Sequence, residues 1–153
     1  MPQQRVVCVG NPLCHDDGVA FVVRAALTPS LSSRTDVELV DIADFGLASL
    51  DAFLNVEHVV VVDAVTTGRS PGTCRVLETL EFAPKMTCSV GHAVSLASML
   101  ELVALLQGVE RTPKVSVVGI EAENLMPFGT AISSAVRAAV PKAVELVLAA
   151  LSQ

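Results

Sequence analysis

Five short runs of the chain have the apolar patterning of β-strands. Residues 6–9 and 58–65 are almost entirely apolar, which is typical of parallel strands buried on both faces. Residues 37–42 alternate between apolar and polar side chains, as a strand with one better buried face does. Residues 115–120 predict another strand. Residues 73–77 form a short run that no helix separates from the previous strand, so we expect it at an antiparallel edge.

Helical spacing of apolar residues fills the segments between these strands. It predicts a helix over residues 19–27 that ends at Thr28-Pro29-Ser30, and a short helix over residues 45–54. A third helix should run from His92 to a stop at Gly108. A long C-terminal helix is expected over residues 130–151, where Pro141 should kink it or restart it at a first-turn position. Residues 81–91 show no period and predict an irregular loop.

Alternating strands and helices predict an α/β fold whose parallel strands are joined by right-handed crossovers. We expect a single-domain three-layer sandwich over residues 1–153: a twisted, mostly parallel five-stranded sheet with helices on both faces. The strand order 2-1-3-4-5 is common for a sheet of this size, and it allows one antiparallel strand. In that order the first and third strands are neighbours, and ligand sites lie between their carboxyl ends.

Composition narrows the class of protein. The chain has 153 residues, 52% of them hydrophobic, and a net charge of −6, which together argue against intrinsic disorder and a nucleic-acid footprint. No apolar run approaches the ~20 residues of a membrane span, and the amino terminus leads directly into a strand without a signal peptide. We therefore expect a cytoplasmic protein that binds neither membrane nor nucleic acid. Its four scattered cysteines, Cys8, Cys14, Cys74 and Cys88, predict free thiols.

Acidic residues stand where two neighbouring strands are expected to end. Asp16 and Asp17 follow the first strand, and Asp63 ends the four-valine strand. The topology brings these carboxylates to one crevice, and His92 can face the same crevice if its loop folds over it. Two carboxylates and an imidazole form a ligand set for a divalent first-row metal, with positions open for water or substrate. The same residues could instead act as general acids and bases without a metal.

The flanks of these residues resemble the hydrogenase maturation proteases, the endopeptidases that process the large subunits of nickel-iron hydrogenases. Residues 10–19 (GNPLCHDDGV) resemble the opening motif of that family. Residues 60–64 (VVVDA) resemble its second acidic motif, and residues 91–92 (GH) its histidine motif. Residues 41–46 (DIADFG) stand where the family has an acidic turn containing glycine. The resemblance covers nearly the whole chain as one maturation-protease-like domain.

The resemblance implies a substrate and a set of site residues. The partner would be the precursor of a hydrogenase large subunit, from which the protease removes a C-terminal extension. Asp17, Asp63 and His92 match the residues that engage nickel already present in the precursor, and would serve as both metal ligands and catalytic residues. The free enzyme would be metal-free and monomeric. Two departures from the family pattern are Ala20, in place of a second glycine, and Val90, where proline commonly precedes the histidine motif.

Each nearby residue also has a purely structural interpretation. Paired aspartates before a helix often cap it, and Asp16 is the better candidate for capping or for orienting Asp17. His15 and His58 have no support from the resemblance, so we expect both at the surface. Cys14 could bind a soft metal, but a single thiol more often packs.

Three rival functions have different requirements. A phospho-receiver domain also ends its third strand in an aspartate, but it needs a lysine where this chain has Glu121. A nucleotide-binding unit needs a Gly-x-Gly-x-x-Gly loop, and Pro12 removes an amide that such a loop would use. A non-enzymatic checkpoint or chaperone for the metal centre would have the same site residues as a protease, so the sequence leaves that alternative open.

Overall fold

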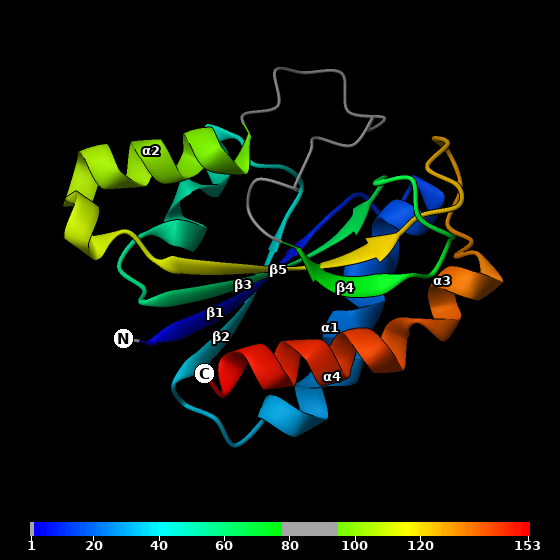
Figure 1. The fold of residues 1–153 in the computed structure, drawn as a ribbon, viewed down its shortest axis with the longest axis horizontal. Coiled ribbons are helices and arrows are strands. Elements are labelled where there is room, and N and C mark those ends of the chain that lie inside the picture. Colours follow the sequence, from blue (N-terminus) through cyan, green and yellow to red (C-terminus); the bar gives the residue numbers. More distant parts are fainter. Residues whose placement is uncertain (1, 78–94) are drawn as a thin grey trace.

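A five-stranded sheet forms the centre of the protein, shown by a computed structural model that describes residues 2–77 and 95–153. Its strands are β1 (Gln4–Val9), β2 (Val37–Ile42), β3 (His58–Val65), β4 (Cys74–Leu77) and β5 (Lys114–Glu121), in the order β2-β1-β3-β5-β4 (Figure 1). All neighbouring strands are parallel except β4, which pairs antiparallel with β5. The α/β fold class and the antiparallel edge strand are therefore confirmed.

The predicted order 2-1-3-4-5 is wrong for its last two strands. The chain leaves β3, forms β4 at the edge, and returns through a helix to insert β5 between β3 and β4. The register pairs His58 with Lys114 at one end and Val65 with Glu121 at the other. Because β5 carries buried valines at its centre, it needs neighbours on both sides, whereas the short β4 with its exposed Val76 tolerates an edge.

Helices cover both faces of the sheet (Figure 1). One face carries α1 (Val19–Leu31), α3 (Ser134–Ala138) and α4 (Val140–Leu151). The other carries α2 (Leu96–Gln107) and the 3-10 turn η2 (Leu47–Phe53).

The C-terminal helical stretch is interrupted as predicted, since α4 restarts with Pro141 in its first turn. The predicted end of the first helix at Thr28 is wrong, because α1 continues through Pro29. Proline lies in the last turn there and removes one terminal hydrogen bond. The third helix stops before Gly108 as expected, but its predicted beginning at His92 is wrong, because Ser95 caps α2 and the helix begins at Leu96. The loop predicted over residues 81–91 lies outside the described residues.

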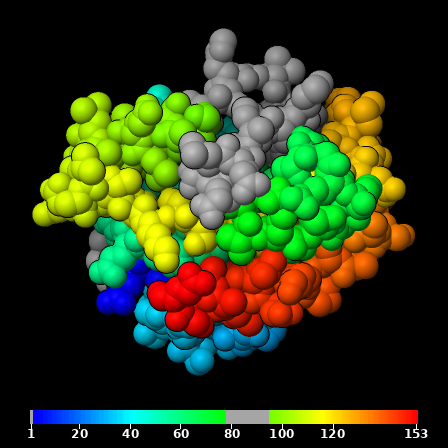
Figure 2. Space-filling view, viewed as in Figure 1, coloured from blue at the N-terminus to red at the C-terminus, as the bar shows by residue number. Residues whose placement is uncertain are grey.

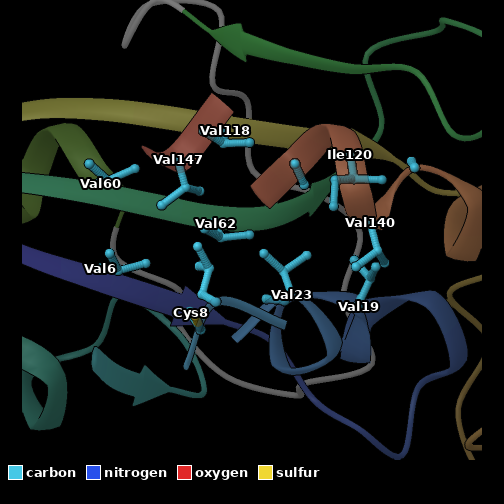
Figure 3. Close-up of a cluster of buried hydrophobic side chains, with 14 of the residues drawn as sticks. Val6, Cys8, Val19, Val23, Val60, Val62, Val118, Ile120, Val140 and Val147 are labelled. Carbon is cyan, nitrogen blue, oxygen red and sulfur yellow. The ribbon is translucent and has the colours of Figure 1, made fainter. Parts of the chain in front are cut away.

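Alternation along β3 divides the core into two layers. Val60 and Val62 pack with Val19 and Val23 of α1 on one face (Figure 3), while Val61 packs with α2 and η2 on the other. Period-two alternation places Asp63 on the same face as Val61, at the carboxyl end of the sheet. A fully buried strand thus carries a carboxylate at its end.

His58 begins β3 and is buried, so its predicted surface position is wrong. Its Nε2 lies 3.1 Å from the hydroxyl of Ser116, and burial, with Lys114 nearby, lowers its pKa. Within residues 2–77 and 95–153, no helix is long and apolar enough to cross a membrane.

Candidate active site

The turn after β1 closes tightly on itself. The backbone at Gly10 lies so close to the carbonyl of Asp17 that a Cβ atom at position 10 would overlap it. The N–H of Asn11 donates to Oδ2 of Asp17 at 2.8 Å, while the Asn11 side chain accepts from the N–H of Leu13 at 2.9 Å. Asp17 is therefore oriented by the backbone of its own turn, and glycine at position 10 makes that approach sterically feasible.

Asp16 and Asp17, which the sequence leaves equivalent, have different surroundings. Asp16 is fully buried, and its carboxylate accepts hydrogen bonds from the N–H groups of Glu123, Asn124 and Ser133 at 2.7–2.9 Å, and from the Ser133 hydroxyl at 2.8 Å. Burial raises the pKa of Asp16, but these hydrogen bonds outweigh it, so the pKa lies below that of an ordinary aspartate. Asp16 links the turn η1 (His15–Gly18) to the loop that follows β5.

Further backbone contacts tie the same two segments together. The N–H of Gly129 donates to the carbonyl of Leu13 at 2.9 Å, and the N–H of His15 donates to the carbonyl of Gly129 at 2.8 Å. The N–H of Asp16 also donates to the carbonyl of Asn124 at 2.9 Å. Figure 1 shows this loop, in gold after β5, beside the blue segment that leads into α1. The edge of the molecule that carries Asp17 is therefore built from the turn after β1 and the loop after β5, which are joined by hydrogen bonds.

Asp63 approaches the same edge from the centre of the sheet. In the register of β1 and β3 it lies opposite Val9, the last residue before the turn, and η1 contacts β3 directly. Asp17 and Asp63 are 3% and 2% exposed, respectively. The structure therefore brings the turn after β1 against β3, while the meeting of the two carboxylates in one crevice stays a prediction.

His92 lies outside the described residues, so its place beside these carboxylates stays a prediction. Among residues 2–77 and 95–153, no group of three His, Cys, Asp or Glu side chains is arranged to hold a metal ion. A three-ligand site therefore needs a donor from elsewhere in the chain or from a bound partner. Carboxylate oxygens from Asp17 and Asp63 do suit a divalent first-row metal as two members of such a set.

A hollow borders this turn. It has a volume of about 330 Å³ and is lined by Gly10, Pro12, Phe21 and residues 41–43. A second hollow of about 610 Å³ lies near the opposite edge of the sheet, among residues at the start of β1, the start of β3 and the turn after α2. The smaller hollow is the better candidate for binding substrate, because its lining includes Gly10, whose backbone lies against the carbonyl of Asp17.

The remaining candidates of the turn are structural. His15 has a positive φ of 50°, and its Nδ1 lies 3.1 Å from the carbonyl of Ala131, so it helps to hold the loop after β5. Cys14 takes part in a disulfide, which makes the prediction of four free thiols wrong for this residue. Cys8 and Cys74 are free thiols. Burial raises the pKa of Cys8 to about 12 and that of Cys74 to about 11, which leaves both unreactive at neutral pH.

Sequence reasoning missed two features near the site. One is Ser133, which is separated from Asp16 by 117 residues and has no local pattern to mark it. The other is Glu121, which is buried at the end of β5 and accepts from the N–H and hydroxyl of Thr67 at 2.7 and 2.6 Å and from the N–H of Gly68 at 3.0 Å. Glu121 thereby holds the turn that follows Asp63. The sequence signal that could have marked Glu121 is an acidic residue at the end of an apolar strand.

Comparison with known proteins decides between the candidate families. The family model described as hydrogenase maturation protease matches residues 22–150. The hydrogenase 2 maturation protease of Escherichia coli (strain K12) is 30% identical over 150 residues, which cover 97% of this chain and 90% of that protein. The chain belongs to the hydrogenase maturation protease family. This membership favours a maturation protease over the phospho-receiver and nucleotide-binding alternatives.

Solved structures of maturation proteases share the fold. The hydrogenase maturating endopeptidase HybD from E. coli superimposes with a TM-score of 0.77 at 26% identity, covering 99% of this chain and 93% of that one. The hydrogenase 2 maturation peptidase from Thaumarchaeota archaeon SCGC_AB-539-E09 gives a TM-score of 0.67 at 28% identity, covering 98% of each chain. The five-stranded sheet and its covering helices are thus the fold of the maturation protease family.

Proposed function

We propose that this chain is an endopeptidase that removes the C-terminal extension of an immature nickel-iron hydrogenase large subunit and recognises nickel in that precursor. The observation that carries the proposal is the burial of Asp17 and Asp63 together at the carboxyl edge of β1 and β3, with Asp16 engaged elsewhere. Family membership supports the protease activity. The nickel dependence and the assignment of Asp17, Asp63 and His92 are the parts that we propose.

Asp63 and Asp17 are held in place in different ways. Asp63 projects from a strand that is buried along its whole length, so its backbone cannot move without disturbing the core. Asp17 is held by the N–H of Asn11 at 2.8 Å, which orients one carboxylate oxygen. Ligands held on rigid elements by hydrogen bonds are pre-organised, so little conformational entropy is lost when the substrate binds.

His92 would complete the set with a nitrogen donor. It stands four residues before Leu96, which is buried in the same core layer as Val65 at the end of β3. Four residues span at most about 14 Å, so no more than that length of chain separates His92 from the start of α2. When bound, nickel would supply Lewis-acid chemistry that polarises the scissile carbonyl or activates water. Asp17 and Asp63 would hold the substrate's metal centre against the bond to be cut.

The test compares nickel-loaded and nickel-free precursor and reads the C-terminal mass of the product. We expect cleavage of the loaded precursor alone. Asp17→Asn and Asp63→Asn, which keep the side-chain shape, should lower the rate about 100-fold or more, beyond the loss typical of groups that only support a ligand. His92→Ala should do the same. Asp51→Asn, at an exposed aspartate of η2, is the matched control and should process at the wild-type rate.

Each part of the proposal can fail separately. Equal cleavage of loaded and nickel-free precursor would remove nickel recognition and leave the protease. Nickel-dependent binding of the precursor without any cleavage would identify the non-enzymatic checkpoint instead. Full activity in the Asp17→Asn and Asp63→Asn variants would show that the reacting groups lie elsewhere.

A further inference from the structure

The loop after β5 presents apolar side chains to solvent beside the candidate active site. Phe128 is 95% exposed, Met126 is 67% exposed, and Leu13 of the facing turn is 58% exposed. The N–H of Gly129, the residue after Phe128, bonds to the carbonyl of Leu13, so the two loops present these side chains together. We call Leu13, Met126 and Phe128 the apolar rim. An exposed apolar group of this kind commonly marks a contact with another protein.

The apolar rim is held in place from both sides. Before it, the N–H groups of Glu123 and Asn124 bond to Asp16, and the N–H of Met126 donates to the Asn124 side chain at 2.9 Å. After it, Gly129 bonds to the turn that carries His15. Between these anchors Phe128 adopts a φ of 66°, which is unusual for a bulky residue. A fully exposed aromatic ring held in a costly backbone conformation gains nothing for the free protein, whereas a pre-organised aromatic side chain suits a binding contact.

Charge restricts what this edge can bind. The segments 10–18 and 121–133 contain no lysine or arginine, and Glu123 is exposed on the second of them, with Asp16, Asp17 and Glu121 buried beneath. An apolar partner segment bearing basic side chains fits such an edge, whereas an acidic segment would be repelled. Leu13 of the rim belongs to the same turn as Asp17, so the rim is continuous with the segment that would meet a protein processed at that site.

We propose that the apolar rim docks an apolar, basic segment of the precursor large subunit next to the bond that is cut. This inference rests on the proposed function, because the rim would bind the precursor that the protease is proposed to cleave. Phe128 is its centre. In Figure 2 the gold residues of this loop lie along the upper right edge of the molecule, away from α2 at the left. Asp16 acts as a positioning residue for the rim, because its carboxylate bonds the loop on both sides of Phe128, at Asn124 and at Ser133.

The kinetic test replaces Phe128 with asparagine, a residue that tolerates positive φ, so the loop keeps its backbone conformation. The expected result is a rise of about tenfold or more in KM for the full-length precursor, as for a central interface residue, with kcat within about twofold. The matched control is Leu105→Gln. Leu105 is 81% exposed on α2, which leads to the start of β5 and hence to the opposite edge of the sheet. The KM of the Leu105→Gln variant for the precursor should equal that of the wild type. An unchanged KM in the Phe128→Asn variant would overturn the proposal.

A second test does not depend on cleavage. A photo-crosslinking benzophenone side chain at position 128 should join the precursor, and mass spectrometry should place the crosslink in an apolar segment with basic neighbours. The same group at position 105 should give no such product. If the position-128 variant crosslinks to the precursor but the wild-type protein does not cleave it, the rim is supported and the protease is overturned. A wild type that cleaves while position 128 joins only a second copy of this chain, or nothing, overturns the rim and leaves the protease standing.

Discussion

Replacing Asp16 with asparagine removes the charge from the most heavily hydrogen-bonded carboxylate that the structure describes near the site. Three backbone N–H groups and one hydroxyl donate to its two oxygens. The asparagine amide keeps one acceptor oxygen but points an NH₂ group at a donor, most directly at the N–H of Ser133. Losing one charge-assisted hydrogen bond and weakening the others should lower the free energy of unfolding by about 2–4 kcal/mol.

The effect should be visible in unfolding and in the loop itself. For a chain of this size the loss corresponds to a drop of about 5–15 °C in Tm. The amide resonances of Glu123, Asn124 and Ser133 should all move in an ¹H–¹⁵N spectrum, because the same carboxylate bonds all three. Asp51→Asn, at an exposed aspartate, should change the free energy of unfolding by less than about 0.5 kcal/mol.

The direction in which pH changes the stability contribution of Asp16 follows from its lowered pKa. The pKa of Asp16 in the folded protein is lower than the ~3.9 of an unfolded aspartate, so the unfolded state binds more protons in acid. The contribution of Asp16 to stability is therefore complete above the unfolded pKa and is lost as the pH falls through the folded pKa. The difference between wild type and Asp16→Asn should be constant near neutral pH and shrink in acid. Equal stability at pH 7, or a difference that grows in acid, would refute this reasoning.

Three further predictions concern other residues of the described structure. Gly10→Ala places a Cβ on the carbonyl of Asp17, so the turn must shift; we expect precursor processing to slow at least about tenfold, and a wild-type rate would contradict the close approach. Glu121→Gln weakens the hold on Thr67 and should lower the free energy of unfolding by about 1–3 kcal/mol in urea denaturation; an unchanged midpoint would exclude that structural role. Cys8, whose pKa burial raises to about 12, should resist alkylation at pH 8 in the native protein, and rapid mass gain with iodoacetamide would show that the thiol is accessible.

The apolar patterning of the chain was enough to predict most elements of the fold. Four consecutive valines before Asp63 predict a strand buried on both faces, and β3 has this position. The same pattern says nothing of which strand lies beside β3 on its other side, because buried valines suit any inner position. The order of β4 and β5 was wrong for that reason, and so was the position of His58, whose burial depends on β5 supplying Ser116 as a neighbour.

The sequence predicted some features of the candidate site, and only the tertiary structure showed the others. The sequence by itself determined that Asp17 follows one strand and that Asp63 lies near the carboxyl end of its neighbour, since parallel strands present their carboxyl ends at one edge. Only the tertiary structure separated Asp16 from Asp17, because the groups that bind Asp16 come from a loop more than a hundred residues further along the chain. The exposure of Phe128 likewise could not be predicted from the sequence. Hydrogen bonds between distant backbone segments leave no local pattern, so these contacts exist only once the chain has folded.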